Sequence, residues 1–191
     1  MRKDRLEAFS DGVLAIIITI MVLGLQTPHE ATISALIPVV PALLSYILSF
    51  VFLGIYWSNH HHLCQAIEKV DGRVLWANLH LLFWLSLIPF VTSWVGENHF
   101  QSVPAALYGV VLLCAAIAYF ILAKSLVALH GKDSVIATAL GADFKGKISI
   151  VLYAVAIPLA FVESWLSFAL YVFVALMWLV PDRRIENIFR R

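Results

Sequence analysis

Charged residues are scarce in this sequence of 191 residues: Asp, Glu, Lys and Arg make up 13% of it, about half their usual share. The formal net charge is only +1, so the chain has no basic field that would recognise nucleic acid. Its two cysteines, Cys64 and Cys114, are too few and too far apart to predict a zinc site or a disulfide framework. In contrast, 62% of the residues are hydrophobic and the mean hydropathy is +0.91. Such a composition predicts an all-α membrane protein.

Apolar runs of roughly 20 residues, the length that a spanning helix needs, divide the chain into predicted membrane spans. Six spans are expected within a single domain covering residues 1–191, at residues 6–25, 36–57, 74–95, 103–123, 148–162 and 165–180. The last two are short and meet at Glu163 and Ser164. Joined, they would form a helix of about 50 Å, which is too long for one bilayer, so we predict two separate helices.

The positive charges determine the expected orientation of these spans. Every Lys and Arg lies near one of the two termini or in the second or fourth connection. The odd-numbered connections carry Glu30, Glu97 and Glu163 instead. Because Lys and Arg collect in cytoplasmic segments, this alternation predicts an even number of spans with both termini in the cytoplasm. The polar stretch 130–147 is then expected to be a cytoplasmic loop.

Ionisable residues open the first span. Asp11 should lie about one and a half turns inside the apolar zone, where such a group usually marks a function or a buried pair. The alternative is a charge at the membrane surface, favoured by the dipole at the start of the helix.

The same helix carries an apolar stripe. At about 100° per residue, one face is formed by Gly12, Ile16, Thr19, Ile20 and Leu23. Asp11 lies roughly 140° from Ile16 on this helix. If the stripe faces a pore, Asp11 therefore faces a neighbouring helix and acts as an anchor, not as an ion ligand. Apolar faces of membrane helices more often meet lipid or the protein core, and the spacing alone leaves this choice open.

Three short segments resemble a known family. Residues 5–11, with the pattern Arg-x-x-x-Phe-Ser-Asp, look like the motif that opens the first span in the endolysosomal potassium channel family (transmembrane protein 175), bacterial branch. Residues 57–62 (Trp-Ser-Asn-His-His-His) and 78–80 (Asn-Leu-His) support this resemblance, which covers essentially the whole chain. It implies six transmembrane helices per subunit and a homotetramer in the inner membrane of a bacterium. It also implies passive, potassium-selective permeation, with K⁺ as the permeant ion and no cofactor.

The resemblance also implies roles for individual residues. Family members lack the usual carbonyl filter, and this sequence has no Thr-Val-Gly-Tyr-Gly loop either. Instead, the central pore is lined by the first helix, with constriction rings implied at Ile16, Thr19, Ile20 and Leu23. A network that ties this helix to the second and third is implied at Arg5, Phe9, Ser10, Asp11, Trp57, His61 and Asn78. Which of the three adjacent histidines takes part is left open.

Other functions fit the sequence less well. Three adjacent histidines at 60–62 point about 100° apart on a helix, whereas zinc needs i, i+4 spacing, so no metal is expected. A secondary transporter of a cation or small solute coupled to protons is the main alternative. Transporters of that kind use ionisable groups near the membrane midplane, where this sequence has almost none. No clustered catalytic residues or phosphate loop appears, so no enzyme is predicted, and a structural membrane protein without conductance stays open.

Overall fold

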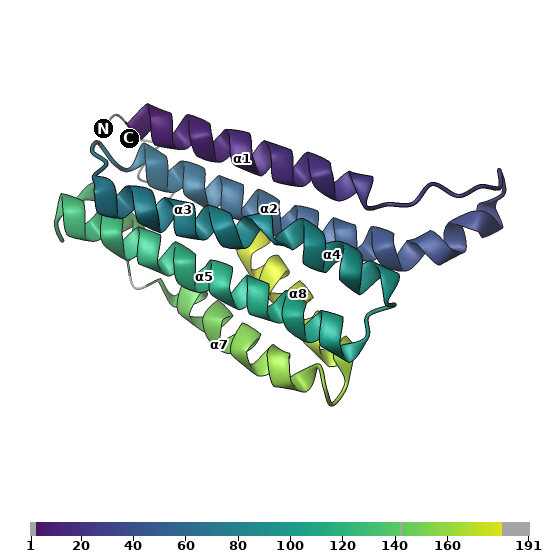
Figure 1. Ribbon diagram of the computed structural model, residues 1–191. Helices are drawn as coiled ribbons and strands as arrows, with labels where there is room; N and C mark the ends of the chain where they lie inside the picture. Colours follow the sequence, from purple (N-terminus) through teal and green to yellow (C-terminus); the bar gives the residue numbers. More distant parts are fainter. Residues whose placement is uncertain (1–2, 142, 181–191) are drawn as a thin grey trace.

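The computed structural model describes residues 3–141 and 143–180, which form a bundle of long helices (Figure 1). Four helical segments of this part are long and apolar enough to cross a membrane. They are α1 (Lys3–Leu23), η1 with α2 (Ile33–Val39 and Val40–Gln65), α3 with α4 (Gly72–Ser86 and Ile88–Glu97), and α5 (Ser102–His130). Three shorter helices follow: α6 (Val135–Leu140), α7 (Phe144–Leu159) and α8 (Ser164–Leu179).

The last two predicted spans correspond to α7 and α8, which are separate helices of 16 residues each. The junction between them lies at Glu163 and Ser164, as predicted. The side chain of Glu163 accepts a hydrogen bond from the backbone N–H of Trp165 at 3.4 Å and caps α8. Each helix is about 24 Å long, less than the ~30 Å hydrocarbon core of a bilayer. By length and composition, therefore, only the four longer segments of the described chain qualify as spans.

The third span is interrupted at Leu87 because Pro89 follows two residues later. Proline lacks a backbone N–H and fits best in the first turn of a helix; here α3 ends at Ser86 and Pro89 lies in the first turn of α4. Hydrogen bonds brace the broken segment from inside the bundle. The hydroxyl of Ser49 on α2 lies 2.7 Å from that of Thr92 on α4 and 3.0 Å from that of Tyr108 on α5. These three buried side chains hold α2, α4 and α5 together.

The polar stretch 130–147 is not entirely a loop, which corrects the prediction. It contains α6 and the first turn of α7. Ser134 caps α6, since its hydroxyl accepts from the backbone N–H of Ala137 at 3.3 Å. The one buried side chain of α6, Ile136, packs into the hydrophobic core. Local capping and a single apolar anchor thus form a short helix that hydropathy does not indicate.

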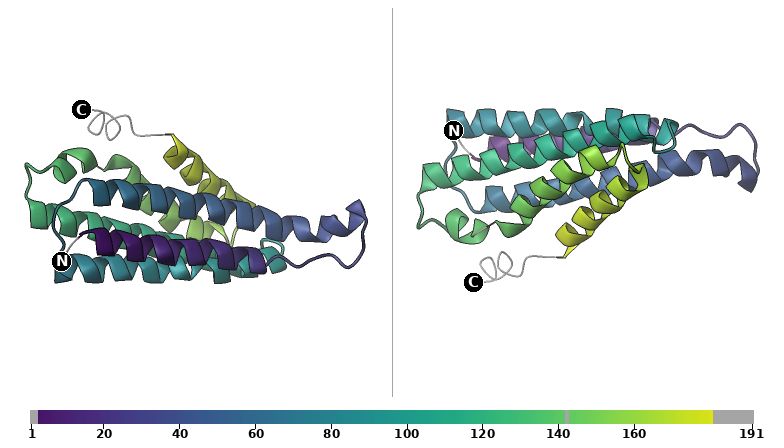
Figure 2. Two further views of the ribbon diagram at one scale, coloured as in Figure 1. Left: turned by 90° about the horizontal axis from the view of Figure 1, so that it is seen from above. Right: turned by 90° about the horizontal axis from the view of Figure 1, so that it is seen from below.

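The described Lys and Arg residues lie toward one end of the bundle together with most of the acidic residues, whereas only acidic residues lie toward the other end. The successive long helices run in alternating directions (Figures 1 and 2). Glu30, Glu97 and Glu163 lie where α1 meets η1, α4 meets α5, and α7 meets α8. The Lys and Arg side chains lie at the other end, near the start of α1, between α2 and α3, and between α5 and α7. They are Lys3, Arg5, Lys69, Arg73, Lys124, Lys132, Lys145 and Lys147. Arg2 and the C-terminal arginines, which contributed to the prediction, lie outside the described residues.

The first helix lies at one edge of the bundle (Figure 1). Its main contacts are with α2, α3 and α4, while α5, α7 and α8 pack on the other side of these helices. One face of α1 is therefore covered by its own chain, and the opposite face is not.

Candidate functional site

The two faces of α1 differ in exposure. The covered face consists of Leu6, Ser10, Leu14, Ile17 and Met21, which follow one another at steps of three or four residues. The opposite face carries the predicted apolar stripe. Of the stripe, Ile16 is 58% exposed and Leu23 is 80% exposed, and Gly12, Thr19 and Ile20 are exposed as well. All four residues with an implied constriction role therefore point away from the chain's own core.

Thr19 is the polar member of these four. Its hydroxyl lies 3.0 Å from the carbonyl oxygen of Ala15 and 2.9 Å from that of Ile16, to which it donates. The donor is thereby satisfied within the helix. The lone pairs of the same oxygen stay available on the exposed face, where they can accept a hydrogen bond or contact a cation.

Behind the stripe, a buried chain of hydrogen bonds joins α1 to α3 and α2. Ser10 donates to the backbone oxygen of Leu6 at 2.8 Å and accepts from the amide nitrogen of Asn78 at 2.9 Å. The amide oxygen of Asn78 lies 2.8 Å from Nε2 of His60, and Nδ1 of His60 lies 3.7 Å from the sulfur of Cys64. All donors and acceptors match if His60 is neutral with its proton on Nε2. The chain of bonds fixes how α1 is rotated against its neighbours.

A second set of contacts lies nearer the solvent-exposed side of the same helices. The indole N–H of Trp57 donates to the carboxylate of Asp11 at 3.0 Å, and the Trp57 ring stacks on His61 with centroids 6.1 Å apart. Nδ1 of His61 lies 2.9 Å from the carboxylate of Glu7, while its Nε2 lies 2.8 Å from the amide nitrogen of Gln65. Asp11 therefore faces α2, as expected for a residue 140° from the stripe, and serves there as an acceptor.

The structure brings together most, but not all, of the residues implied for the network. Ser10 and Asn78 meet in the buried chain, and Asp11, Trp57 and His61 meet in the outer set. Arg5 and Phe9 lie on the exposed side of α1 and join neither set within the described residues. In one isolated chain they have no role in the network.

Glu7 was missed from the sequence, and His60 was one of the three histidines between which the choice was left open. His60 is the buried partner of Asn78, and Glu7 is the partner of His61. A signal for His60 was present, because it continues a buried stripe of α2 at helical spacing: Ser45, Ser49, Leu53, His60 and Cys64. Glu7 lies three and four residues before Ser10 and Asp11, which places it on the same side of α1.

The three adjacent histidines do not converge on one point. His60 turns toward Asn78 and His61 toward Glu7, as expected for neighbours about 100° apart. Across residues 3–141 and 143–180, no group of three or more His, Cys, Asp or Glu side chains is arranged to hold a metal ion. The chemistry of the site is therefore that of an apolar exposed face with one hydroxyl, held in place by a polar anchor.

Comparisons with known proteins point to one family. The family model described as "Endosomal/lysosomal potassium channel TMEM175" matches residues 5–89, which contain both the stripe and the anchor. A potassium channel of Chryseobacterium sp. (strain P1-3) is 52% identical over 187 residues, which cover 98% of this chain and 97% of that protein. An endosomal/lysosomal proton channel of Danio rerio is 27% identical over 94% of this chain, although the match spans only 36% of that longer protein.

A solved structure shares the fold. It is the crystal structure of a lysosomal potassium-selective channel TMEM175 homolog from Chamaesiphon minutus, with a TM-score of 0.80. The two sequences are 28% identical, and the match covers 93% of this chain and 96% of that one. The likeness therefore extends over the entire bundle, including the short helices α7 and α8.

Proposed function

This chain belongs to the TMEM175 family of potassium channels, and from that premise we propose that its copies assemble around a central pore lined by α1. The protein is a potassium channel and not an enzyme. Nothing in the proposed mechanism needs a cofactor, because permeation is passive and K⁺ is the ion that the pore selects.

The observation that carries the pore proposal is the orientation of α1. Its exposed face presents Ile16, Thr19, Ile20 and Leu23, while hydrogen bonds through Ser10 and Asp11 hold the opposite side on α2 and α3. Polar bonds of this kind are strong orienting forces for a membrane helix, because lipid offers no replacement partner. The exposed face of α1 therefore has one fixed orientation, and in the proposed assembly it faces the pore.

One helix cannot enclose a channel, so the pore requires several copies. Closed symmetric assemblies are the usual solution for identical subunits, and we propose a homotetramer, as the family resemblance implies. Each stripe residue then forms a ring of four side chains. Along the axis, the rings of Ile16 and Ile20 are about 6 Å apart, and that of Leu23 lies about 4.5 Å further on.

Rings of bulky apolar side chains act as a constriction that can close by dewetting. Potassium gives up its water more readily than sodium, so a narrow apolar neck favours K⁺ without a carbonyl filter. Thr19 lies between Ile16 and Ile20 and offers hydroxyl oxygens to a partly dehydrated ion. In this scheme, ion selectivity depends on ring diameter and on the Thr19 oxygens together.

We further propose six membrane spans with both termini in the cytoplasm, α7 and α8 being the two short ones. The position of the described Lys and Arg residues supports this topology, since all of them lie in segments at one end of the bundle. The bacterial relative supports a location in the inner membrane of a bacterium.

The experiment that tests this proposal is a reversal-potential measurement on purified full-length protein in a planar bilayer, with K⁺ on one side and Na⁺ on the other. A reversal potential near the potassium equilibrium value is expected. A second recording, with equal K⁺ on both sides and a pH gradient, separates potassium from proton permeation, which the name of the zebrafish relative suggests. A reversal potential that follows the proton gradient, or a saturating flux driven by it, would contradict the potassium channel and favour a proton channel or a proton-coupled transporter.

A further inference from the structure

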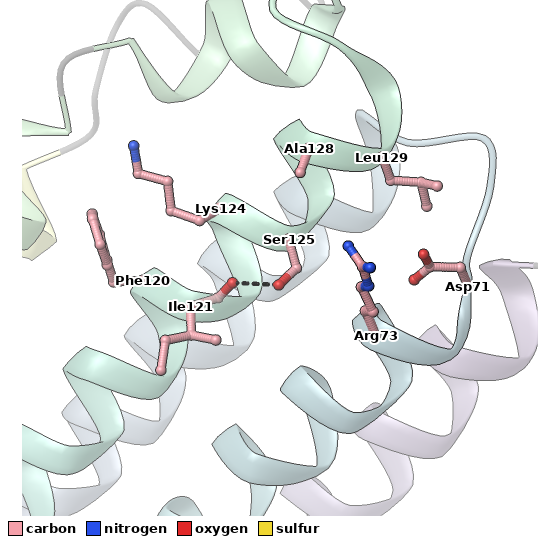
Figure 3. A pocket seen from close by; sticks show the side chains of 8 residues that line it. All are labelled: Asp71, Arg73, Phe120, Ile121, Lys124, Ser125, Ala128 and Leu129. Atoms are coloured by element: carbon pink, nitrogen blue, oxygen red, sulfur yellow. Dashed lines mark hydrogen bonds between the residues drawn. The ribbon is translucent and has the colours of Figure 1, made fainter.

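A pocket of about 510 Å³ opens between the start of α3 and the last turns of α5, far from the exposed stripe of α1 (Figure 3). It lies at the end of the bundle where the Lys and Arg side chains gather. The residues that line it are Asp71, Arg73, Phe120, Ile121, Lys124, Ser125, Ala128 and Leu129.

Two cations border this pocket from different helices. Figure 3 shows Arg73 on α3 and Lys124 on α5 on opposite sides of Ser125, with the Lys124 ammonium extending away from Arg73 on the side of Phe120. The Lys124 ammonium lies 5.4 Å from the centre of the Phe120 ring, which is a cation–π contact and leaves its N–H donors unsatisfied. Within the described residues, neither cation has a carboxylate within ion-pair distance.

Asp71 is the acidic residue of the pocket and partly offsets the two positive charges. Its carboxylate is already engaged, because it accepts from the backbone N–H of Val74 at 2.9 Å and so caps α3. The pocket therefore has a net charge of +1, with two cationic groups free to bind an anion. Ser125 donates its hydroxyl proton to the backbone oxygen of Ile121 and adds no further charge.

Below the cations, the walls of the pocket become apolar and continue as exposed stripes toward the middle of the bundle. On α5, the stripe continues from Lys124 through Ile121 to Ile117. On α3, the exposed face next to the pocket runs from Arg73 through Trp76, which is 75% exposed, and the polar His80 to Phe83. An exposed tryptophan one turn from a terminal cation is typical of a helix face at the membrane–water boundary. The pocket therefore has cationic side chains where it opens and exposed apolar side chains further along the two helices.

We propose that this pocket binds an anionic phospholipid, with Arg73 and Lys124 holding the phosphate and an acyl chain lying along Ile121 and Trp76. Basic pockets between membrane helices on the cytoplasmic side bind anionic headgroups in this way. Arginine offers a planar fork of N–H donors to phosphate oxygens, and lysine contributes a point charge beside it. The proposal goes beyond potassium permeation and relies only on this end of the bundle lying at the membrane surface.

A free phosphate ion offers the same charge chemistry but would use only the mouth of the pocket. The exposed apolar side chains next to the cations favour the lipid. An acyl chain can cover these side chains, whereas a soluble anion cannot contact them and gains no binding energy from them. A carboxylate from a neighbouring copy is the other occupant that the charges would accept. The experiment therefore has to distinguish these three sources.

Native mass spectrometry of the full-length protein in detergent distinguishes them, since it reads bound lipid and oligomeric state at once. Dioleoylphosphatidylglycerol is the anionic probe, dioleoylphosphatidylcholine the neutral one with the same acyl chains, and glycerol 3-phosphate and inorganic phosphate the soluble anions. The variants are Arg73→Gln, Lys124→Gln and the two together. The control is the double variant Lys69→Gln/Lys132→Gln, which removes the same charge from exposed sites outside the pocket.

Phosphatidylglycerol is expected to be retained in preference to phosphatidylcholine. Its apparent affinity should fall about fivefold for each pocket variant and about 30-fold for both, with the control near the wild-type value.

Equal loss in the control, or equal retention of the two lipids, would contradict a headgroup site in this pocket. Displacement of the lipid by millimolar glycerol 3-phosphate or inorganic phosphate would assign the site to soluble anions. Dissociation of the oligomer by the double pocket variant would place a neighbouring copy there, and either result would overturn the proposal.

Discussion

The two faces of α1 are both largely apolar, and yet they have opposite surroundings. Leu14 and Ile17 are buried against the chain's own helices, while Ile16 and Ile20 face outward. What separates them is a pair of polar residues, Ser10 and Asp11, whose partners lie on α3 and α2. In a membrane helix the apolar residues fit either lipid or protein, so a few hydrogen bonds decide which face is covered.

The polar contacts of Ser10 and Asp11 fix the rotation of α1, and the proposed pore depends on that rotation. The anchor and the stripe share one rigid helix, so a change in the rotation of α1 would move every stripe residue at once. A rotation by one residue, about 100°, would replace Ile16 by Ile17 on the exposed face. The polar contacts near the N-terminal end of α1 therefore set the shape of the proposed constriction further along the helix.

The largest difference between the faces is expected when the same substitution is made on each. Leu14→Asn would lose core packing and bury an amide without a partner, which lowers the free energy of unfolding by about 3 kcal/mol or more. Ile16→Asn, on the exposed face, should change it by less than about 1 kcal/mol. For a chain of this size, the midpoint of thermal unfolding in detergent should fall by roughly 6–12 °C for the first variant.

In bilayer recordings, Ile16→Asn should raise the single-channel conductance, because one apolar ring becomes hydrophilic. Equal destabilisation by the two variants would mean that Ile16 is covered in the assembled protein, and would contradict an exposed face at this position.

The next effect concerns the buried anchor. Asn78→Leu keeps the volume of the side chain but leaves the Ser10 oxygen without a donor and the His60 ring without an acceptor. The expected loss is about 2 kcal/mol of unfolding free energy, measured by thermal unfolding in detergent. Asn59→Leu is the matched control, because the described contact of Asn59 is to Ile55 on its own helix. An equal loss of unfolding free energy in the control would show that the Asn78 hydrogen bonds between helices contribute no more than a bond within one helix.

A smaller effect is expected at the outer contact of the anchor. Trp57 is 48% exposed, so replacing it by Phe removes the indole N–H bond to Asp11 in a partly hydrated place. We expect a loss of about 1 kcal/mol or less. A double-mutant cycle with Asp11→Ala, which removes the acceptor, isolates the pair, and Trp76→Phe serves as the control on an exposed tryptophan of α3. Additive effects of the Trp57 and Asp11 changes would show that the bond does not orient α1.

The smallest effect on stability, and the most specific one on function, is expected for Thr19→Val. The hydroxyl bonds only to its own helix, so unfolding should be nearly unchanged. If its oxygen contacts the permeating ion, the loss of about 1 kcal/mol per ion should lower the potassium-to-sodium permeability ratio about fivefold. The reversal potential in mixed K⁺ and Na⁺ measures this ratio. A ratio equal to that of the wild type would remove Thr19 from the selectivity mechanism.

Much of this arrangement follows from residue spacing alone. The stripe Ile16–Leu23 and the opposite direction of Asp11 come directly from the 100° step of a helix, and this step does not depend on tertiary contacts. The junction at Glu163 follows from a polar pair within an apolar run, whereas the break near Leu87 was not predicted, although Pro89 gave a local signal for it. These are local rules, and they predict local features well.

The parts that escaped prediction depend on contacts between helices. Choosing His60 over His61 as the partner of Asn78 requires the rotation of α2 against α3, which no single helix encodes. Helix α6 is stabilised by burial of Ile136, which hydropathy cannot register in so short a segment. Arg5 and Phe9 are exposed, and the described part of the chain gives neither of them a place in the network.

The most direct test of the central claim, that the exposed face of α1 lines the ion path, is thiol block of a cysteine placed on it. In a Cys64→Ala/Cys114→Ala background, Leu23→Cys is compared with Leu44→Cys, an exposed position on α2. We predict that a charged, membrane-impermeant thiol reagent added on the outer side stops the potassium current of the Leu23→Cys protein and leaves that of Leu44→Cys unchanged. An unaffected current in the Leu23→Cys protein, with the background still conducting, would mean that this face of α1 meets lipid and would contradict the account.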